Sequence, residues 1–291
     1  MSEKKQSGKD RTFWIRFRTG AILTVITVAV MIYGGYALWG ILMAVSLIGL
    51  MELYRSVDVH KKLPAAVGYL AACGWYGLLL YGKLTGEAFP IRYGSEHLAV
   101  MTAAFLILLL AVYVFGFPRF NSEQVTMVFF GFFYVAVSLS YIFLVRELKG
   151  GQYTVWLIFI GSWGADTMAY LVGRKIGTHK IVPVLSPKKS LEGFIGGFVG
   201  AILLGVIYAC IFLKQLQATG EFSNPVLSFA IIAGVSSLVS MIGDLAASAI
   251  KRDRQIKDYG RLLPGHGGIL DRFDSVIFIA PIVYYLLYYG I

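Results

Sequence analysis

Long apolar runs separated by short polar segments dominate this sequence. Most of these runs are close to the length of a membrane-spanning helix, which needs about 20 apolar residues. The run from 19 to 51 is too long for one span and short for two, and Gly34-Gly35 indicates a tight hairpin within it. The pattern predicts an all-α, polytopic membrane helix bundle. We place nine spans, with bounds good to a few residues, at 19–34, 36–53, 64–82, 98–116, 124–145, 152–172, 192–213, 226–250 and 273–290.

Composition supports the membrane interpretation. Of the 291 residues, 57% are hydrophobic and 14% are charged, whereas a soluble domain has about 25% charged residues. High hydrophobicity with low charge also excludes a disordered chain. The two cysteines, Cys73 and Cys210, both lie in apolar runs, so we expect neither a disulfide framework nor a zinc site. No repeat, low-complexity tract or Pro/Ser-rich linker divides the chain, which predicts one integral membrane domain over 1–291.

The placement of lysine and arginine predicts the orientation, because cytoplasmic loops are enriched in both. With nine spans, one side of the membrane receives 21 of the 26 basic residues. A single span over 19–51 would move the amino-terminal basic residues to the other side and remove this asymmetry. We therefore predict a cytoplasmic amino terminus and an external carboxyl terminus. The five basic residues on the external side are Lys83, Arg92, Arg146, Lys149 and Lys214.

Glycines recur at helix-packing spacing in the span over 192–213. Gly193 and Gly197 form one small-xxx-small pair, and Gly196 and Gly200 form a second that overlaps it. Small residues at this spacing let two helix backbones approach closely in lipid. The pattern predicts a tight helix contact along this face.

Two aspartates lie inside predicted spans, where a charged group is costly and therefore informative. Asp244 stands seven residues before Lys251, and Asp166 stands eight before Arg174. At the rise of an α-helix, each lies about 10 Å from the basic, cytoplasmic end of its span. Such an acid either pairs with a neighbouring helix, lies on an ion pathway, or binds a metal ion or substrate.

The densest polar segment joins the last two predicted spans. Asp244, Ser248 and Arg252 are spaced i, i+4 and i+8, so on a helix they form one stripe from membrane to cytosol. Asp271 and Asp274 stand three apart at the start of the last span. Carboxylates among basic residues suit Mg²⁺ held between protein and phosphates, because Mg²⁺ prefers oxygen and usually takes one or two protein ligands. Contacts with anionic lipid heads would explain the lysines but not the aspartates.

A second basic segment opens the span over 192–213. Ser186, which precedes a proline, or Ser190, which precedes Glu192, is a plausible helix start. A helix amino terminus with Lys188 and Lys189 beside it is suited to binding an anion. The alternative is that both lysines merely extend from a span end to the aqueous phase.

The polar segment after Asp244 resembles the signature of the phosphatidate cytidylyltransferases (CDP-diacylglycerol synthases). The pattern is Ser-x-apolar-Lys-Arg, four residues, Lys-Asp, and then His-Gly-Gly-apolar-x-Asp-Arg-apolar-Asp. The stretch from Asp166 to Arg174 and the Ser-Pro-Lys-Lys-Ser-x-Glu-Gly segment look like two further polar blocks of that family, so the resemblance covers about 160–275. The signature positions here are Ser248, Ile250, Lys251, Arg252, Lys257, Asp258, His266, Gly267, Gly268, Ile269, Asp271, Arg272, Phe273 and Asp274.

Membership of that family implies that CTP and phosphatidate react to give CDP-diacylglycerol and pyrophosphate, with Mg²⁺, in an all-helical membrane homodimer. It implies hydrophobic spans over 1–150 and a catalytic half over 151–291. We assign Asp244 and Asp271 as the first-choice metal ligands, with Asp166 as a further candidate. His266 could instead only brace its turn. The catalytic residues expected on this basis are Asp244, Asp271, Lys251, Arg252, Lys257, Asp258 and His266. The substrate-binding residues expected are Asp166, Ser186, Lys188, Lys189, Ser248, Arg272 and Asp274.

Location and partners can also be predicted. We expect the bacterial cell (inner) membrane and no nucleic-acid partner, and the distribution of basic residues predicts a cytoplasmic active site. One alternative is a CTP-dependent polyprenol or phytol kinase, which would transfer the γ-phosphoryl group and release CDP. The other is a secondary transporter with Asp166 and Asp244 as coupling-ion sites. Transporters tend to show corresponding broken spans in two halves, whereas the polar motifs here all lie in the carboxyl-terminal half.

Overall fold

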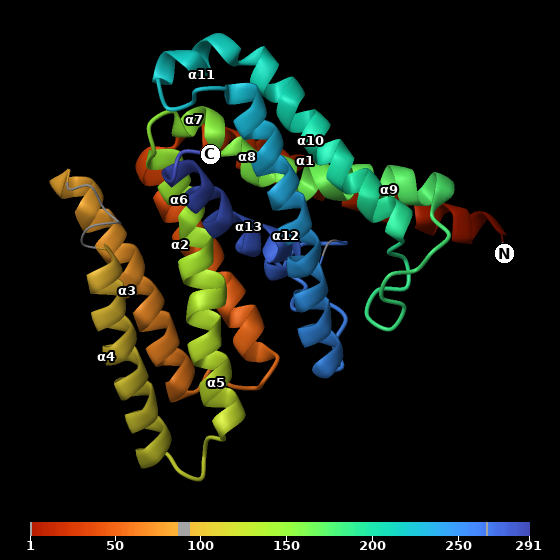
Figure 1. Cartoon of the computed structure of the whole chain (residues 1–291). Helices are drawn as coiled ribbons and strands as arrows, with labels where there is room; N and C mark the ends of the chain where they lie inside the picture. The colour runs from red at the N-terminus through yellow and green to blue at the C-terminus, as the bar shows by residue number, and fades with distance from the viewer. Residues whose placement is uncertain (1, 87–93, 266) are drawn as a thin grey trace. The chain divides into compact units, whose positions relative to one another are not determined.

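The computed structural model describes residues 2–86, 94–265 and 267–291, and the regular elements of these residues are all helices (Figure 1). The only β-type pairings in this part of the chain are two isolated bridges, Lys180 with Ser190 and Leu263 with Gly267. The all-α prediction is confirmed. The elements in order are α1 (Ser2–Tyr33), α2 (Gly35–Arg55), α3 (Leu63–Thr85), α4 (Gly94–Phe115), α5 (Ser122–Gly131), η1 (Phe132–Val137), α6 (Ser138–Glu147), α7 (Gly151–Thr154), α8 (Trp156–Phe159), η2 (Ile160–Gly164), α9 (Ala165–Ile176), α10 (Leu191–Ile211), α11 (Leu213–Thr219), α12 (Pro225–Asp253) and α13 (Leu270–Tyr288), where η marks a π-helical turn.

Within the described residues, seven helical segments are long and apolar enough to cross a membrane, judged by length and composition. The chain is therefore an integral membrane protein. The first apolar helix, Arg18–Tyr33, is shorter than these seven, and α13 carries three charged residues near its start. The count of nine spans stays a prediction. The seven segments are Gly35–Arg55, Leu63–Thr85, Leu98–Phe115, Ser122–Glu147, Gly151–Ile176, Leu191–Ile211 and Pro225–Asp253.

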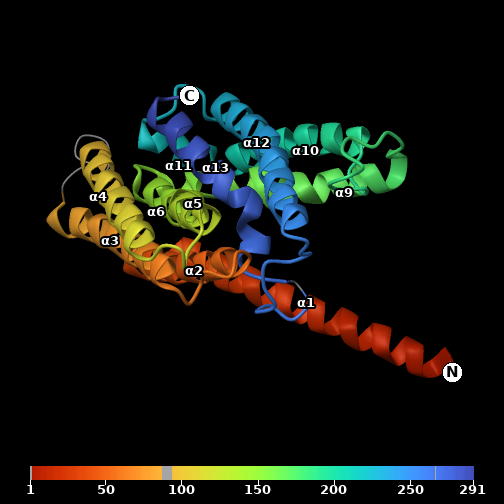
Figure 2. The same ribbon diagram turned by 90° about the horizontal axis from the view of Figure 1, so that it is seen from below.

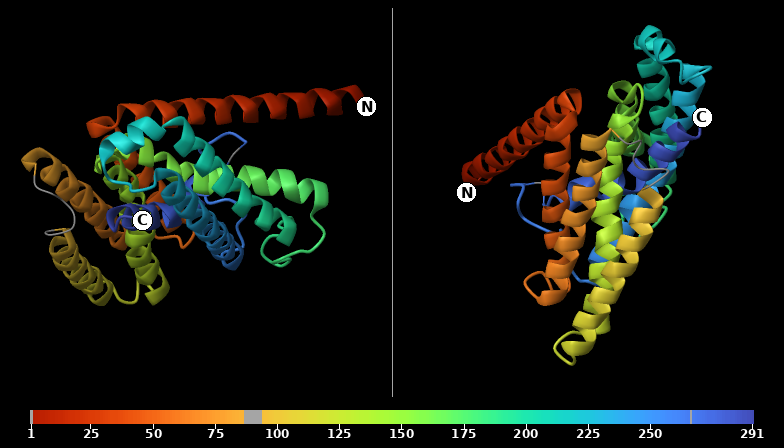
Figure 3. Two further views of the ribbon diagram at one scale, coloured as in Figure 1. Left: turned by 45° about the horizontal axis from the view of Figure 1, so that its top comes forward. Right: turned by 90° about the vertical axis from the view of Figure 1, so that its left-hand side faces the viewer.

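The tight turn predicted between the first two apolar runs is confirmed, although the two helices diverge from it (Figures 1 and 3). Helix α1 ends at Tyr33 and α2 begins at Gly35. Gly34 and Gly35 have φ angles of 66° and 55°, in the left-handed region that glycine adopts without steric cost. Two glycines therefore reverse the chain without any longer loop.

Contacts divide the chain into two compact units, which we describe separately. Unit 1 contains the residues up to 137 together with 256–273, and unit 2 contains 138–255 together with 274–291. Each unit therefore combines one long segment of the chain with a short segment from the carboxyl-terminal part of the sequence. The single domain over 1–291, with its halves at 1–150 and 151–291, stays a prediction.

Unit 1 is built on helices α2 to α5, which run alongside one another in the right-hand view of Figure 3. Two polar side chains join α5 to the end of α2 and the residues after it. The hydroxyl of Tyr54 donates to the carbonyl of Val128 at 3.0 Å, and the side-chain amide of Gln124 donates to the carbonyl of Val57 at 3.0 Å. These bonds satisfy buried polar atoms and fix the carboxyl-terminal end of α2. The core around them includes Leu50, Leu53, Trp75, Tyr76 and Leu79.

Unit 2 contains a close contact between α9 and α10, which lie side by side in Figures 1 and 2. A Cβ at Gly193 or Gly197 would come within 2.9 Å of carbonyl oxygens of α9. A Cβ at Gly196 or Gly200 would come within 2.5 Å of side chains of α9. The tight contact predicted from the glycine spacing is confirmed. Helix α12 packs on the same helix α10.

Candidate functional site

Unit 2 contains a cavity of about 380 Å³, a volume that suits a small-molecule site. It is lined by α9, α10, α12 and the loop that joins α9 to α10. Its charged lining residues are Asp166, Arg174, Lys188 and Lys189. The rest of the lining is mostly apolar and includes glycines and alanines of the α9–α10 contact. The cavity therefore offers cations and an apolar wall to the same ligand. Its large apolar lining residues are Ile181, Phe194, Phe198 and Met241.

A π-helical turn precedes the helix that carries Asp166. The predicted span over 152–172 is interrupted by η2, and α9 begins directly after it with Asp166 in its first turn. Gly161 within η2 lies against Ser236 of α12 and has no room for a Cβ. A π-turn changes which face the following residues present and is frequent at functional sites. Asp166 lines the cavity.

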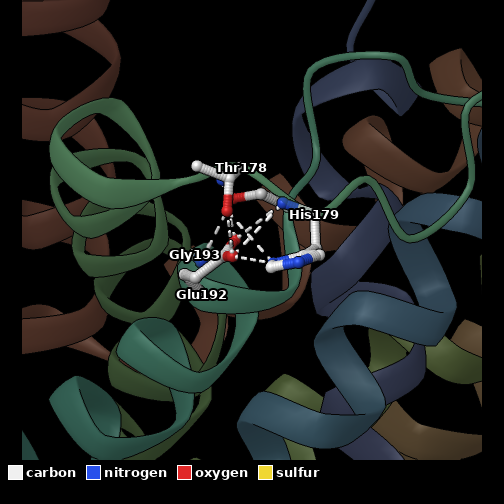
Figure 4. Close-up of polar contacts among 5 residues, drawn as sticks. Thr178, His179, Glu192 and Gly193 are labelled. Carbon is white, nitrogen blue, oxygen red and sulfur yellow. Dashed lines mark hydrogen bonds and ion pairs between the residues drawn. The ribbon is translucent and has the colours of Figure 1, made fainter.

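The loop between α9 and α10 is held by Glu192 (Figure 4). The carboxylate of Glu192 accepts hydrogen bonds from the backbone N–H of Thr178 at 3.1 Å and from the Thr178 hydroxyl at 2.8 Å. It also accepts from the backbone N–H of His179 at 3.2 Å, and Nδ1 of His179 lies 2.6 Å from Oε1. The loop that carries both lysines is therefore fixed at its first residues by the start of α10.

The predicted helix start at Ser190 is confirmed. Ser190 is the N-cap of α10, and its hydroxyl accepts a hydrogen bond from the backbone N–H of Gly193 at 3.2 Å. Ser186 shapes the loop through its backbone, because its N–H donates to Val182 at 2.9 Å and its carbonyl accepts from Lys189 at 3.2 Å. Both serines thus order the segment that presents the lysines.

A cluster of opposite charges lies beside the cavity. Nζ of Lys189 is 2.5 Å from Oδ2 of Asp244, and the two side chains are 25% and 29% exposed. Asp274, on α13, interacts electrostatically with Asp244, Asp166 and Lys251. These interactions connect three carboxylates and two lysines of unit 2. This combination can bind a cation and phosphate oxygens together.

The predicted polar stripe of α12 lies on one unbroken helix. Asp244, Ser248 and Arg252 keep their i, i+4, i+8 spacing along α12, which ends at Asp253. Ser248 is half-buried and Arg252 is exposed. The stripe thus runs towards the exposed end of the helix, as the sequence predicts.

Unit 1 contains a second, more polar pocket of about 500 Å³. The predicted residues Lys257 and Asp258 line it, and both are exposed. Arg55 and Ser56 from the end of α2 and Arg261 from the loop complete its polar lining. Three cations therefore surround this pocket.

Asp271 organises the loop that precedes α13. It is 6% exposed, and its Oδ2 accepts hydrogen bonds from the backbone N–H groups of Tyr259 at 2.8 Å and Gly268 at 3.0 Å. Arg272, the next residue, is exposed. The predicted catalytic His266 lies outside the described residues. Asp271 is therefore a structural cap as well as a candidate ligand.

Comparison with known proteins extends the resemblance beyond these motifs. A family model described as "Cytidylyltransferase family" matches residues 14–290. The chain belongs to the cytidylyltransferase family. Proteins named phosphatidate cytidylyltransferase are similar along nearly their whole length: that of Bacillus subtilis (strain 168) is 32% identical over 277 residues, covering 94% of this chain and 96% of the relative. That of Staphylococcus haemolyticus (strain JCSC1435) is 30% identical over 273 residues, covering 94% and 98%.

Magnesium, the cofactor that the resemblance predicts, can be compared with the carboxylates that the structure brings together. No group of three or more His, Cys, Asp or Glu side chains that could hold a metal ion occurs among the described residues. Mg²⁺ does not require one, because it usually combines one or two carboxylates with waters and substrate phosphates. Asp244, with Asp166 and Asp274 as acidic neighbours, fits that requirement within unit 2. Asp271 belongs to unit 1, and its sharing of a metal ion with Asp244 stays a prediction.

Motifs alone do not identify four residues that line or support these pockets. Arg174 and Glu192 stand in the quoted motifs without a predicted role. Glu52 and Arg55 lie at the end of α2, outside any recognised motif. The sequence does contain one indication of Glu52: an acidic residue inside an apolar run, one helical turn before the arginine that ends the run. A search for known motifs does not detect it.

Proposed function

We propose that this protein is a phosphatidate cytidylyltransferase, which converts CTP and phosphatidate to CDP-diacylglycerol and pyrophosphate. The observation that carries the proposal is the family match over 14–290, which includes every position of the signature over 248–274. Relatives with this printed name cover nearly all of the chain. The protein is then a membrane nucleotidyltransferase of phospholipid synthesis.

The reaction needs charge neutralisation more than it needs a base. A phosphate monoester has a second pKa of about 6, so the phosphate of phosphatidate is already largely dianionic. Its oxygen attacks the α-phosphorus of CTP, and the bond from that phosphorus to the pyrophosphate oxygen breaks. Two polyanions must meet, and cations that hold them in line supply the catalysis. Each pocket, taken by itself, carries basic residues that can neutralise phosphate charge.

The cavity of unit 2 suits the lipid substrate. Phosphatidate combines an anionic phosphate with apolar chains, and the lining combines Arg174, Lys188 and Lys189 with Phe194 and Phe198. The phosphate would contact the basic side chains, and the glycerol and first methylenes would contact the apolar wall. The polar pocket of unit 1 suits the triphosphate of CTP.

Magnesium would be held by Asp244 and, as the sequence predicts, Asp271. When bound, it would neutralise phosphate charge and stabilise the leaving pyrophosphate. Lys189 pairs with Asp244 in this structure. With Asp244 holding the metal ion, the ammonium group of Lys189 would be free to contact a substrate phosphate.

The proposal includes a location and an assembly. We place the protein in a bacterial cell membrane, with nine spans, a cytoplasmic amino terminus and a cytoplasmic active site. The asymmetry of basic residues supports this orientation. We further propose a homodimer, as the resemblance implies.

The decisive experiment incubates purified protein with labelled CTP and identifies the products that carry the label. One CTP sample carries the label in cytosine and the other in the γ-phosphate, each with phosphatidate or a polyprenol as acceptor. The proposed reaction moves cytosine label into lipid and γ-label into pyrophosphate, with phosphatidate only. Transfer of γ-label to a polyprenol with release of CDP would show the kinase instead. Absence of any product would refute both enzymes.

A further inference from the structure

Glu52 is a buried carboxylate near the end of an apolar helix. It lies three residues before Arg55 in α2 and is 4% exposed. A charged group inside a span is costly unless hydrogen bonds satisfy it. The hydrogen-bond partners of Glu52 therefore indicate the role of this buried carboxylate.

The partners of Glu52 are backbone amides of the signature loop. Oε1 accepts from the N–H of Ile269 at 3.1 Å, and Oε2 accepts from the N–H of Leu270 at 2.8 Å. These amides lie at the start of α13, where backbone N–H groups lack partners within the helix and the helix dipole favours a negative charge. A carboxylate more than two hundred residues away in the sequence thus caps this helix.

Two glycines of the same loop close around the carboxylate. A Cβ at Gly260 or at Gly268 would overlap the side-chain carboxyl group of Glu52. Neither position has a positive φ, so the requirement for glycine comes from close approach rather than from backbone conformation. The loop therefore packs on Glu52 from two separate points of its path.

Glu52 and Asp271 hold adjacent backbone amides of one loop. Asp271 binds the N–H groups of Tyr259 and Gly268, while Glu52 binds the next two N–H groups along the chain. Lys257 and Asp258 directly precede Tyr259 and line the polar pocket. Movement of the loop at Glu52 therefore displaces the side chains that face this pocket.

We propose that Glu52 is a positioning residue: it fixes the loop over 256–271 so that Lys257, Asp258 and Asp271 are held for CTP and its metal ion. The kinetic consequence of this inference rests on the proposed function, whereas the contact between Glu52 and the loop is independent of that function. It assigns a role in the reaction to α2, in the half of the chain where the sequence places no site residue.

The first test is Glu52→Gln, which keeps the size of the side chain but places an amide donor against a backbone donor. Displacement of catalytic groups by about 1 Å can cost about a hundredfold in rate, so we expect kcat/KM for CTP to fall about ten- to a hundredfold. The KM for phosphatidate should not change, because its proposed site is in unit 2. A general loss of folded protein would instead lower kcat without changing either KM.

Hydrogen exchange measures the contact without any reaction. Amides at 269 and 270 should exchange faster in Glu52→Gln, while the amides of α10 stay protected. Glu221→Gln is the matched control, because this exposed carboxylate pairs with Lys149 at 3.1 Å outside both pockets. It should leave exchange and kinetics unchanged.

Gly260→Ala provides a second route to the same contact and decides the question if Glu52→Gln does not fold. Gly260→Ala should also give faster exchange at 269 and 270 and a lower kcat/KM for CTP. The double variant should lose little more kcat/KM than the more affected single variant, because both substitutions act on one contact. Wild-type exchange in both single variants, or faster exchange with wild-type kcat/KM, would overturn the inference. Wild-type protein that transfers no cytidylyl group would refute the proposed function, and the exchange data would then decide on the contact alone.

Discussion

Asp271→Asn and Asp244→Asn should reduce turnover alike but destabilise the protein to different degrees. Each change keeps the size of the side chain and removes its charge. In Asp271, one buried oxygen accepts two backbone N–H groups. In Asp244, the carboxylate makes a 2.5 Å ion pair with Lys189, and both side chains are partly exposed. The two carboxylates therefore contribute differently to folding.

The difference in stability follows from burial. Hydrogen bonds to a charged group contribute about 1 kcal/mol more each than neutral ones, so Asp271→Asn should lower the free energy of unfolding by about 2 kcal/mol. A single ion pair between partly exposed side chains contributes about 1 kcal/mol or less, which limits the cost of Asp244→Asn. We expect the lower thermal unfolding midpoint in detergent for Asp271→Asn.

The kinetic expectation is the same for both variants. Removing one group that stabilises the transition state costs roughly a hundredfold or more in kcat. If both carboxylates act on the same Mg²⁺, the double variant should be little worse than the worse single one, because residues that act as a unit are not additive.

The assay is kcat at saturating Mg²⁺, together with thermal unfolding, for wild type, both single variants and the double variant. Near-wild-type kcat in either single variant would refute the catalytic role of that residue. Multiplication of the two losses in the double variant would refute the shared metal ion. Equal unfolding midpoints for the two single variants would refute the capping role of Asp271.

Three further predictions concern the metal, the orientation and the lysine loop. Chelation should abolish turnover and added Mg²⁺ should restore it, whereas full activity in chelator would contradict the metal proposal. Lys188→Cys, made in a protein without Cys73 and Cys210, places a thiol at an exposed position. This thiol should react with an impermeant reagent from the cytoplasmic side only, and labelling from outside would show the opposite orientation. Glu192→Gln should weaken the bonds to the loop of Figure 4 and lower kcat/KM for phosphatidate with little change in thermal stability; wild-type kinetics would show that the loop does not need them.

Local features of the fold are predictable because they depend on neighbours in the sequence. Apolar runs bounded by charges predict the helices, since in lipid each backbone polar group must be satisfied within its own segment. Gly34-Gly35 ends one helix and starts another because glycine adopts positive φ angles without steric cost, which is also a local property. Ser190 caps α10 through the amide three residues ahead, and the glycines of α10 show their packing face by spacing alone.

Two site features remained hidden because their partners are distant in the sequence. Lys189 and Asp244 stand in separate motifs, and only the folded structure brings the loop before α10 to Asp244 of α12 so that they pair. The π-turn before Asp166 lies against Ser236 through Gly161, and the apolar run around it predicts only a regular helix.

The sequence by itself determined the membrane helices, the family and the polar residues from which a site is built, because each is encoded in short-range patterns or in a contiguous signature. The tertiary structure decided how the signature loop is held. Glu52 binds backbone amides of Ile269 and Leu270, and every residue but proline offers such an amide. No pattern of side chains can therefore reveal the partner of this carboxylate, and only folding places it at the start of α13.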